Sequence, residues 1–177
     1  GLSIRFFGDG RYTEEAFRAA QIAAGAEFEE ALEAFAPEHW REAMGSSGTV
    51  GAVSQVLAAA GHSEGRITPQ GLRWMIEQCL RAGRVDRLEL PGLKEDRRPI
   101  IAGGLCILYT LAAHFDIASL AAARGALRQG VVFDLAKRLA VRQRGDGAPM
   151  VGNDVRDASV RELQRRFMVD VQQAERV

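Results

Sequence analysis

Apolar and polar residues alternate over the first seven positions of the chain, and this alternation predicts a β-strand. The turn-forming residues Gly8-Asp9-Gly10 close the strand. From Thr13 to Pro37 the apolar residues recur every three or four positions, which predicts a long amphipathic helix with Thr13 as its N-cap. We expect this helix to cover one face of a sheet.

Two later stretches follow the order strand, glycine-containing turn, helix. The first begins with a short strand over residues 40–44, continues through the loop 45–49 (Gly-Ser-Ser-Gly-Thr) and resumes helical periodicity at once. The second has a strand over residues 117–122, a turn at Gly125 and a helix as far as residue 139. This repeated order is typical of α/β proteins.

Two helices are expected between these stretches. Thr68 and Pro69 supply a hydroxyl cap and a first-turn proline for one of them. Residues 96–114 are apolar on nearly all sides, so the second helix is expected to be central. Two consecutive glycines inside it, Gly103-Gly104, would each cost about 1 kcal/mol relative to alanine. We therefore expect a neighbouring element to approach closely there.

The C-terminal part has a different pattern. Residues 144–157 contain turn formers and no periodicity, which predicts a linker, and residues 158–177 form an amphipathic helix that needs a partner surface. The whole pattern predicts a helix-rich α/β domain over residues 1–143, with a small mixed sheet flanked by helices, followed by the linker and the C-terminal helix.

Composition supports a soluble globular protein. The 177 residues are 47% hydrophobic and 26% charged, which excludes a disordered or low-complexity chain. No apolar run is long enough to span a bilayer and the start of the chain does not resemble a secretion leader, so we expect a cytoplasmic protein with no membrane partner. Cys79 and Cys106 lie in apolar helical patterns without metal-ligand spacing, which predicts reduced core residues rather than a disulfide or zinc site.

Charge argues against a nucleic-acid-binding protein but is distributed unevenly. Basic and acidic residues number 23 each, so no overall basic field is present to hold nucleic acid. Residues 1–44 carry a net charge of −5, residues 45–135 of +2 and residues 136–177 of +3. Positive charge therefore begins where the loop 45–49 begins.

That loop and two arginines are the candidates for anion binding. Small residues before a helix allow backbone N–H groups to converge on a phosphate, although such a cluster is also the usual form of a simple helix cap. Arg97 and Arg128 each sit beside a predicted helix start, where a guanidinium could bind phosphate in a bidentate manner or simply be solvated. No catalytic signature is present, and the three histidines have no metal-like spacing. The residues alone predict an anion-binding α/β unit.

Three segments in the same order resemble the exopolyphosphatase/guanosine pentaphosphate phosphohydrolase (Ppx/GppA) phosphatase family. They are the loop 45–49, Asp96-Arg97 with the apolar run over residues 103–108, and residues 125–130 (Gly-Ala-Leu-Arg-Gln-Gly). Residues 67–69 and 165–170 look like this family too. The resemblance implies a truncated ribonuclease-H-like domain of the actin, Hsp70 and sugar-kinase superfamily, in which two such domains clasp a phosphate chain.

The resemblance also implies which parts of the family's domains this chain contains. Residues 1–143 look like the second domain, incomplete at its N-terminus, and residues 158–177 like the start of a following helical region. The family's general-base glutamate belongs to the first domain and has no counterpart here, so we expect one wall of the cleft, no catalytic residue, and no activity from this chain alone. Exposed apolar surface at the incomplete sheet is expected to favour a homodimer.

The implied reaction is release of terminal phosphate from inorganic polyphosphate or guanosine pentaphosphate, with Mg²⁺ bound to the substrate. Seven phosphate-binding positions carry over from the family: Gly45, Ser46, Ser47, Gly48, Thr49, Arg97 and Arg128. Ser46 replaces a usual alanine, and Asp96 and Gln129 replace usual glutamates. The loss of charge at Gln129 leaves room for an alternative, a non-catalytic binding or regulatory module for guanosine polyphosphates or protein partners.

Overall fold

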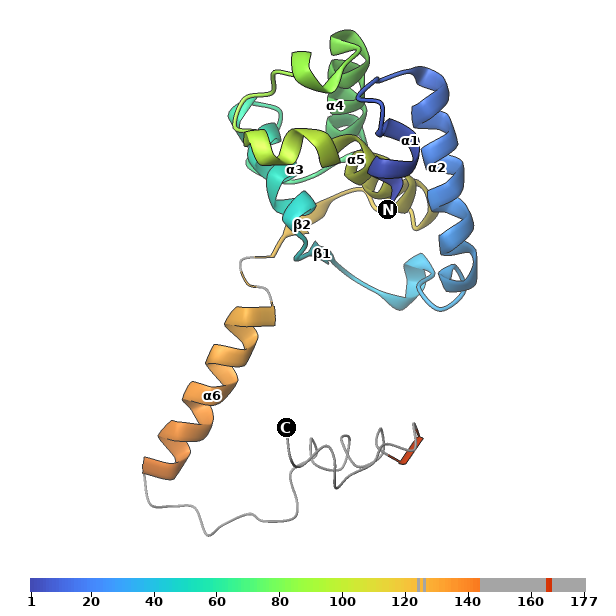
Figure 1. Ribbon diagram of the computed structural model, residues 1–177. Coiled ribbons are helices and arrows are strands. Elements are labelled where there is room, and N and C mark those ends of the chain that lie inside the picture. Colours follow the sequence, from blue (N-terminus) through green and yellow to red (C-terminus); the bar gives the residue numbers. More distant parts are fainter. Residues whose placement is uncertain (124, 126, 144–164, 167–177) are drawn as a thin grey trace. The chain divides into compact units, whose positions relative to one another are not determined.

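The computed structural model describes residues 1–123, 125, 127–143 and 165–166. The chain divides into two compact units, Gly1–Ala126 and Leu127–Val177. In its described part the first unit is a group of helices with two short strands (Figure 1). The predicted linker over residues 144–157 lies outside the described residues, as does the predicted C-terminal helix apart from Arg165 and Arg166, which are helical.

Helix α5 (Arg98–His114) is the centre of the first unit, as its apolar sequence predicted. Residues on several sides of it are buried, including Ile101, Leu105 and Cys106. Four helices pack around it: α1 (Leu2–Phe7), α2 (Glu14–Phe28), α3 (Gly48–Ala59) and α4 (Pro69–Ala82).

The close approach predicted at the two glycines of α5 is confirmed. A Cβ atom added to Gly103 would lie 2.6 Å from the backbone nitrogen of Ser3 and 3.0 Å from its Cα. A Cβ on Gly104 would collide with the methyl group of Thr49. The glycines therefore allow α1 and the start of α3 to contact α5.

The prediction of a strand over the first seven residues is wrong, because residues 2–7 form the helix α1. The Ser3 hydroxyl donates a hydrogen bond to the Ile100 carbonyl (3.0 Å), and Phe7 is buried with its ring centroid 4.9 Å from that of Phe17. Ile4, which the alternating pattern would have buried, is 81% exposed. This segment packs against helices, so side chains one helical turn apart face the core together. The alternating pattern therefore does not determine its structure.

The prediction that the helix after Thr13 covers one face of a sheet is also wrong. Thr13 does cap α2, its hydroxyl oxygen accepting from the Ala16 amide at 3.1 Å. The apolar face of α2, however, packs on the helices α5 and α1 rather than on a sheet. The described strands are too short to offer it a face.

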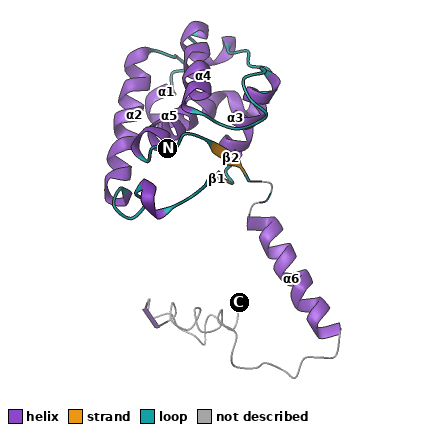
Figure 2. Ribbon diagram, turned by 180° about the vertical axis from the view of Figure 1, so that it is seen from behind, coloured by secondary structure: helices purple, strands orange, loops and turns teal. Residues whose placement is uncertain are grey.

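In the described part of the chain the sheet is two-stranded and parallel, shorter than the mixed sheet that we expected. Strands β1 (Ala43–Gly45) and β2 (Leu120–Ala122) pair in parallel, with Ala43 opposite Leu120 (Figure 2). Ile67 forms an antiparallel bridge to Leu120, with N···O distances of 2.9 and 2.8 Å. The helix-rich α/β class is confirmed.

Helix α4 begins as predicted, and its N-cap is open to test. The Thr68 hydroxyl oxygen accepts from the Gly71 amide at 3.1 Å, and Gly83 ends the helix with a φ of 67°. We expect Thr68→Ala to lower the free energy of unfolding by about 1 kcal/mol, because one first-turn amide loses its acceptor. Urea denaturation followed by circular dichroism measures this. Thr68→Ser keeps the oxygen and should lose less; equal losses would contradict the capping role.

The two cysteines are free and buried, as predicted. Burial raises the pKa of the Cys79 thiol to about 12, with a further contribution from Cys106, and burial likewise raises the pKa of Cys106 to about 12. Above the ordinary thiol pKa the unfolded chain loses protons that the folded chain keeps. Stability should therefore fall between about pH 9 and 12, by up to about 1.4 kcal/mol per pH unit for each thiol.

Unfolding in urea at several alkaline pH values measures this slope. Cys106→Ala should make the fall of stability with pH shallower by the contribution of one thiol. This holds whatever the stability of the variant at neutral pH. A slope unaffected by removal of either thiol would contradict the assignment, because the buried Tyr12 hydroxyl, whose pKa burial also raises, would then carry the whole effect.

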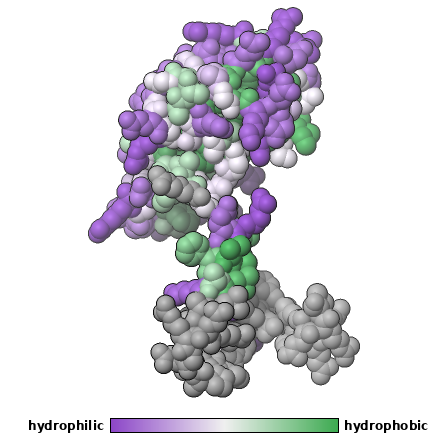
Figure 3. Space-filling model, turned by 90° about the vertical axis from the view of Figure 1, so that its left-hand side faces the viewer, coloured by the Kyte–Doolittle hydropathy of each residue, from purple (hydrophilic) through white to green (hydrophobic). Residues whose placement is uncertain are grey.

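The second unit contains helix α6 (Leu127–Gln143), which confirms the predicted helix after Gly125. Large apolar side chains on α6 are exposed, among them Leu127, Val131 and Phe133, and hydrophobic groups are conspicuous on this helix in Figure 3. Arg138 pairs with Asp134 one turn away at 2.9 Å. No helix in the described part of the chain is long and apolar enough to cross a membrane.

Candidate functional site

The carboxyl ends of β1 and β2 lie side by side, because the two strands are parallel. The amide of Ala123, just after β2, donates to the carbonyl of Gly45 at the end of β1 (2.8 Å). The loop that follows β1 and the segment that follows β2 therefore start from one edge of the sheet. In open α/β folds this edge is where ligands bind.

The loop after β1 leads directly into the N-terminus of α3. Ser47 is the N-cap, and its hydroxyl oxygen accepts from the Val50 amide at 3.2 Å. Gly48 and Thr49 are the first two residues of the helix, where backbone amides have no acceptor within the helix. Residues 46–48 are exposed. The loop can therefore be both a helix cap and an anion-binding site. Ser47 caps the helix, and the amides of Gly48 and Thr49 still lack an acceptor within it.

Arg97 is brought to this loop from a distant part of the sequence. It ends a short 3-10 helix (Glu95–Arg97) that precedes α5. A Cβ added to Gly48 would lie 2.8 Å from Nη1 of Arg97, 3.2 Å from Nη2 and 3.3 Å from Cζ. The end of the guanidinium group thus rests against the backbone of Gly48, in the space that a side chain would fill.

This arrangement concentrates positive charge. The guanidinium group lies beside the N-terminus of α3, where the helix dipole is itself positive. Asp96 offsets part of the charge: its Oδ2 is 3.7 Å from Nε of Arg97, but its side chain is 71% exposed. Solvent screens such a pair strongly. The N–H groups and the guanidinium together suit a phosphate or another oxyanion.

The predicted site residues have different structural roles. A Cβ on Gly45 would come within 2.6 Å of the buried Val50 side chain, so this glycine is needed for packing. Thr49 packs its methyl group on Gly104. Ser46, Ser47 and Gly48 form the exposed part of the loop. Arg128 is exposed on α6, in the second unit.

Two contributors were not predicted as site residues. Asp96 pairs with Arg97, and the only signal for it was its place beside that arginine. Ala123 fixes the end of β1 through its backbone amide, a contact that its side-chain type could not reveal.

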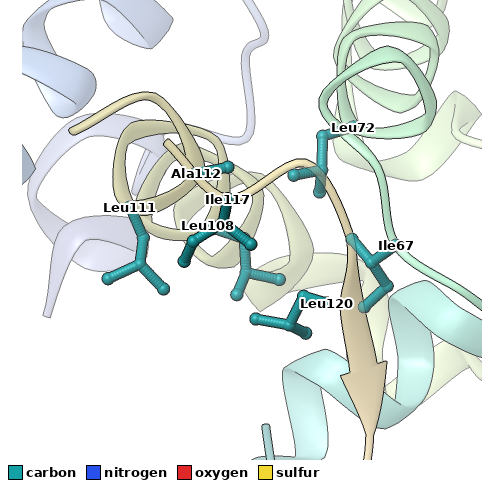
Figure 4. A pocket seen from close by; sticks show the side chains of 7 residues that line it. All are labelled: Ile67, Leu72, Leu108, Leu111, Ala112, Ile117 and Leu120. Atoms are coloured by element: carbon teal, nitrogen blue, oxygen red, sulfur yellow. The ribbon is translucent and has the colours of Figure 1, made fainter. Parts of the chain in front are cut away.

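An apolar hollow elsewhere on the first unit is not a substrate site. Figure 4 shows side chains from α5, the segment before β2, β2 itself and the start of α4 around it, and its cavity volume is about 10 Å³. That is room for roughly one water molecule. The lining residues are Ile67, Leu72, Leu108, Leu111, Ala112, Ile117 and Leu120. They offer no charged group to hold an anion.

The structure also bears on metal binding. Among the residues that it describes, no three His, Cys, Asp or Glu side chains gather as a metal site would require. The groups at the loop are hydrogen-bond donors, which bind anions rather than cations.

Comparison with known families gives a match to a phosphatase family. The model of the Ppx/GppA phosphatase family matches residues 2–139, more than half of the chain. The matched range contains the loop 45–49, Arg97 and Arg128.

Proposed function

Because the chain belongs to the Ppx/GppA phosphatase family, a family of hydrolases, we propose that it forms one phosphate-binding wall of a phosphoanhydride hydrolase. The substrate is inorganic polyphosphate or guanosine pentaphosphate, from which a terminal phosphate is released. The observation that carries this proposal is the Arg97 guanidinium group lying against Gly48 at the N-terminus of α3.

The chemistry of the reaction explains why such a wall is useful. Water attacks the terminal phosphorus in line with the leaving phosphate, and charge spreads over the equatorial oxygens in the transition state. Fixed N–H donors and a guanidinium group stabilise that charge without reorganising. The amides of Gly48 and Thr49 and the Nη groups of Arg97 take this role. Arg128 is proposed as a further phosphate ligand.

Two components of the reaction come from outside these residues. Mg²⁺ arrives on the phosphate oxygens of the substrate, since the site itself offers donors. The glutamate that activates the attacking water is contributed by another part of the protein. In this proposal the 177-residue chain binds polyphosphate but does not hydrolyse it.

Phosphate release tests the proposal. The protein carrying both domains, with Mg²⁺, should release phosphate from long-chain polyphosphate or guanosine pentaphosphate, and Arg97→Ala should lower its kcat/KM. The chain alone should release none. A folded, Mg²⁺-supplied full protein that releases phosphate from neither substrate would contradict the hydrolase proposal.

A second function, a binding module without chemistry, is favoured by the composition of the site. The groups lining the loop are donors, and the carboxylate of Asp96 pairs with Arg97 rather than being poised as a base. Binding of guanosine polyphosphates without release of phosphate by the full protein would support this second function.

A further inference from the structure

We infer that Gly48 and Asp96 are positioning residues: they orient the Arg97 guanidinium group so that both of its Nη atoms face the ligand. This inference rests on the proposed function and assigns roles that neither the loop motif nor the arginine alone implies. Gly48 supplies the space, and the Asp96 carboxylate lies beside the opposite edge of the group, 3.7 Å from Nε.

The role of Gly48 follows from the contact distances. A Cβ at this position would be 2.8 Å from Nη1, closer than Cβ atoms approach other heavy atoms in proteins. Position 48 begins a helix, and its backbone does not need the left-handed conformation reserved for glycine. The helix could therefore accept alanine here, and the guanidinium group could not stay where it is. Glycine at 48 is explained by Arg97 rather than by the backbone.

The role of Asp96 follows from which edge of the guanidinium group it contacts. Its carboxylate faces Nε at 3.7 Å, whereas Gly48 is nearest to Nη1 and Nη2. The two contacts lie at opposite ends of the planar group. The Nη end, the part of the group that can engage an oxyanion in a fork, therefore lies beside the first residue of α3, where the helix amides lack acceptors within the helix. The Arg97 side chain is 39% exposed, so a ligand can reach it.

The direction in which anion binding changes when the Asp96 charge is removed tests the role of this residue. A negative charge near an anion site weakens anion binding by simple Coulomb repulsion, so its removal should strengthen binding. If Asp96 instead orients Arg97, removal of its charge should weaken binding. The two views of this residue therefore predict opposite changes.

The test is a set of calorimetric titrations of the whole chain with tripolyphosphate. Arg97→Ala should raise the Kd about tenfold or more, and Gly48→Ala should raise it by a smaller factor, because the displaced guanidinium group keeps its charge. Because both act through the same group, the double variant Gly48→Ala/Arg97→Ala should bind no more weakly than Arg97→Ala alone. Gly51→Ala is the matched control: Gly51 lies one turn further along α3 with open space around it, so its Kd should not change.

Asp96 is tested in the same titrations. Asp96→Asn should raise the Kd about two- to fivefold, and Asp96→Glu, which keeps the charge, should restore binding. Circular dichroism of each variant verifies that α3 and α5 are intact.

Each remaining outcome overturns a defined statement. If Gly48→Ala weakens binding equally in the presence and absence of Arg97, Gly48 acts independently and its positioning role is wrong. Stronger binding by Asp96→Asn would overturn the role of Asp96. If Arg97→Ala binds tripolyphosphate as the parent does, the phosphate site of the proposed function is wrong, and with it this inference.

Discussion

Gly103→Ala should lower the free energy of unfolding of the first unit by roughly 1–3 kcal/mol. The added Cβ would lie 2.6 Å from the backbone nitrogen of Ser3 and 3.0 Å from its Cα. A flexible side chain could rotate away, but here the whole of α1 must move. That movement would also break the hydrogen bond from the Ser3 hydroxyl to the Ile100 carbonyl.

Urea denaturation of the variant and the parent measures this loss. Gly51→Ala is again the control, because the same substitution in an open helical position should stabilise the protein by up to about 1 kcal/mol. Opposite signs for the two substitutions are expected. Equal stability of Gly103→Ala and the parent would show that α1 does not pack closely on α5.

Arg97→Ala should weaken binding of tripolyphosphate about 10- to 100-fold, the largest functional effect expected of a single substitution in this chain. The guanidinium group lies against the loop residue Gly48. Its removal leaves the amides at the start of α3 to hold the anion alone. Arg97→Lys should be intermediate, because the charge remains but the two-pronged geometry is lost.

Titration calorimetry at two salt concentrations measures these effects. The salt dependence of binding should become weaker when Arg97 is removed, since one fewer cation contacts the anion. Arg81→Ala, which removes an exposed arginine from α4, is the matched control and should bind as the parent does. If the two alanine variants bind equally, Arg97 contributes only general charge.

Local sequence signals predicted helix starts well, whereas the helix expected to run from Thr13 to Pro37 ends at Phe28. Thr13, Ser47 and Thr68 each accept a hydrogen bond from the third residue of the helix that they precede. These caps were readable because the interaction is local and its residue types are few. The paired glycines of α5 were readable for another reason: glycine is costly inside a helix, so its presence predicted a close neighbour, which is confirmed.

The error at the N-terminus shows the limit of periodicity. Residues 2–7 are short enough that alternation and helical spacing both fit, since Leu2 and Phe6 are also one helical turn apart. Tertiary contacts decided between them: Phe7 packs with the Tyr12 and Phe17 rings, and Ser3 is hydrogen-bonded to α5. Nothing in a six-residue pattern specifies whether its neighbours are strands or helices.

The candidate site was predicted in part. The sequence identified the loop as a strand-to-helix turn and Arg97 as an arginine suited to phosphate, but not that the two would touch across 49 positions of sequence. A contact between residues so far apart in the sequence depends on how α5 packs against α3, and no local sequence pattern encodes that packing. Phosphate binding by the loop and by Arg128 stays a prediction.

The functional account combines two kinds of observation. Family membership establishes the hydrolase class, and the geometry of Gly48 and Arg97 supplies a place where a phosphate chain could be held. An electropositive loop would be unremarkable alone, because many helices begin with small residues. A guanidinium group resting on the same helix terminus adds its charge to the positive end of the helix dipole, so the two together attract an anion more strongly than either alone.

The most direct test is a ¹H–¹⁵N correlation spectrum of the whole chain titrated with tripolyphosphate. The account predicts that the amide signals of Gly48 and Thr49 and the side-chain Nε–H signal of Arg97 shift together along one saturable curve. In Arg97→Ala the amide shifts should require much higher ligand concentrations. Shifts confined to other residues, or none at millimolar tripolyphosphate, would contradict the claim that this loop is a phosphate site.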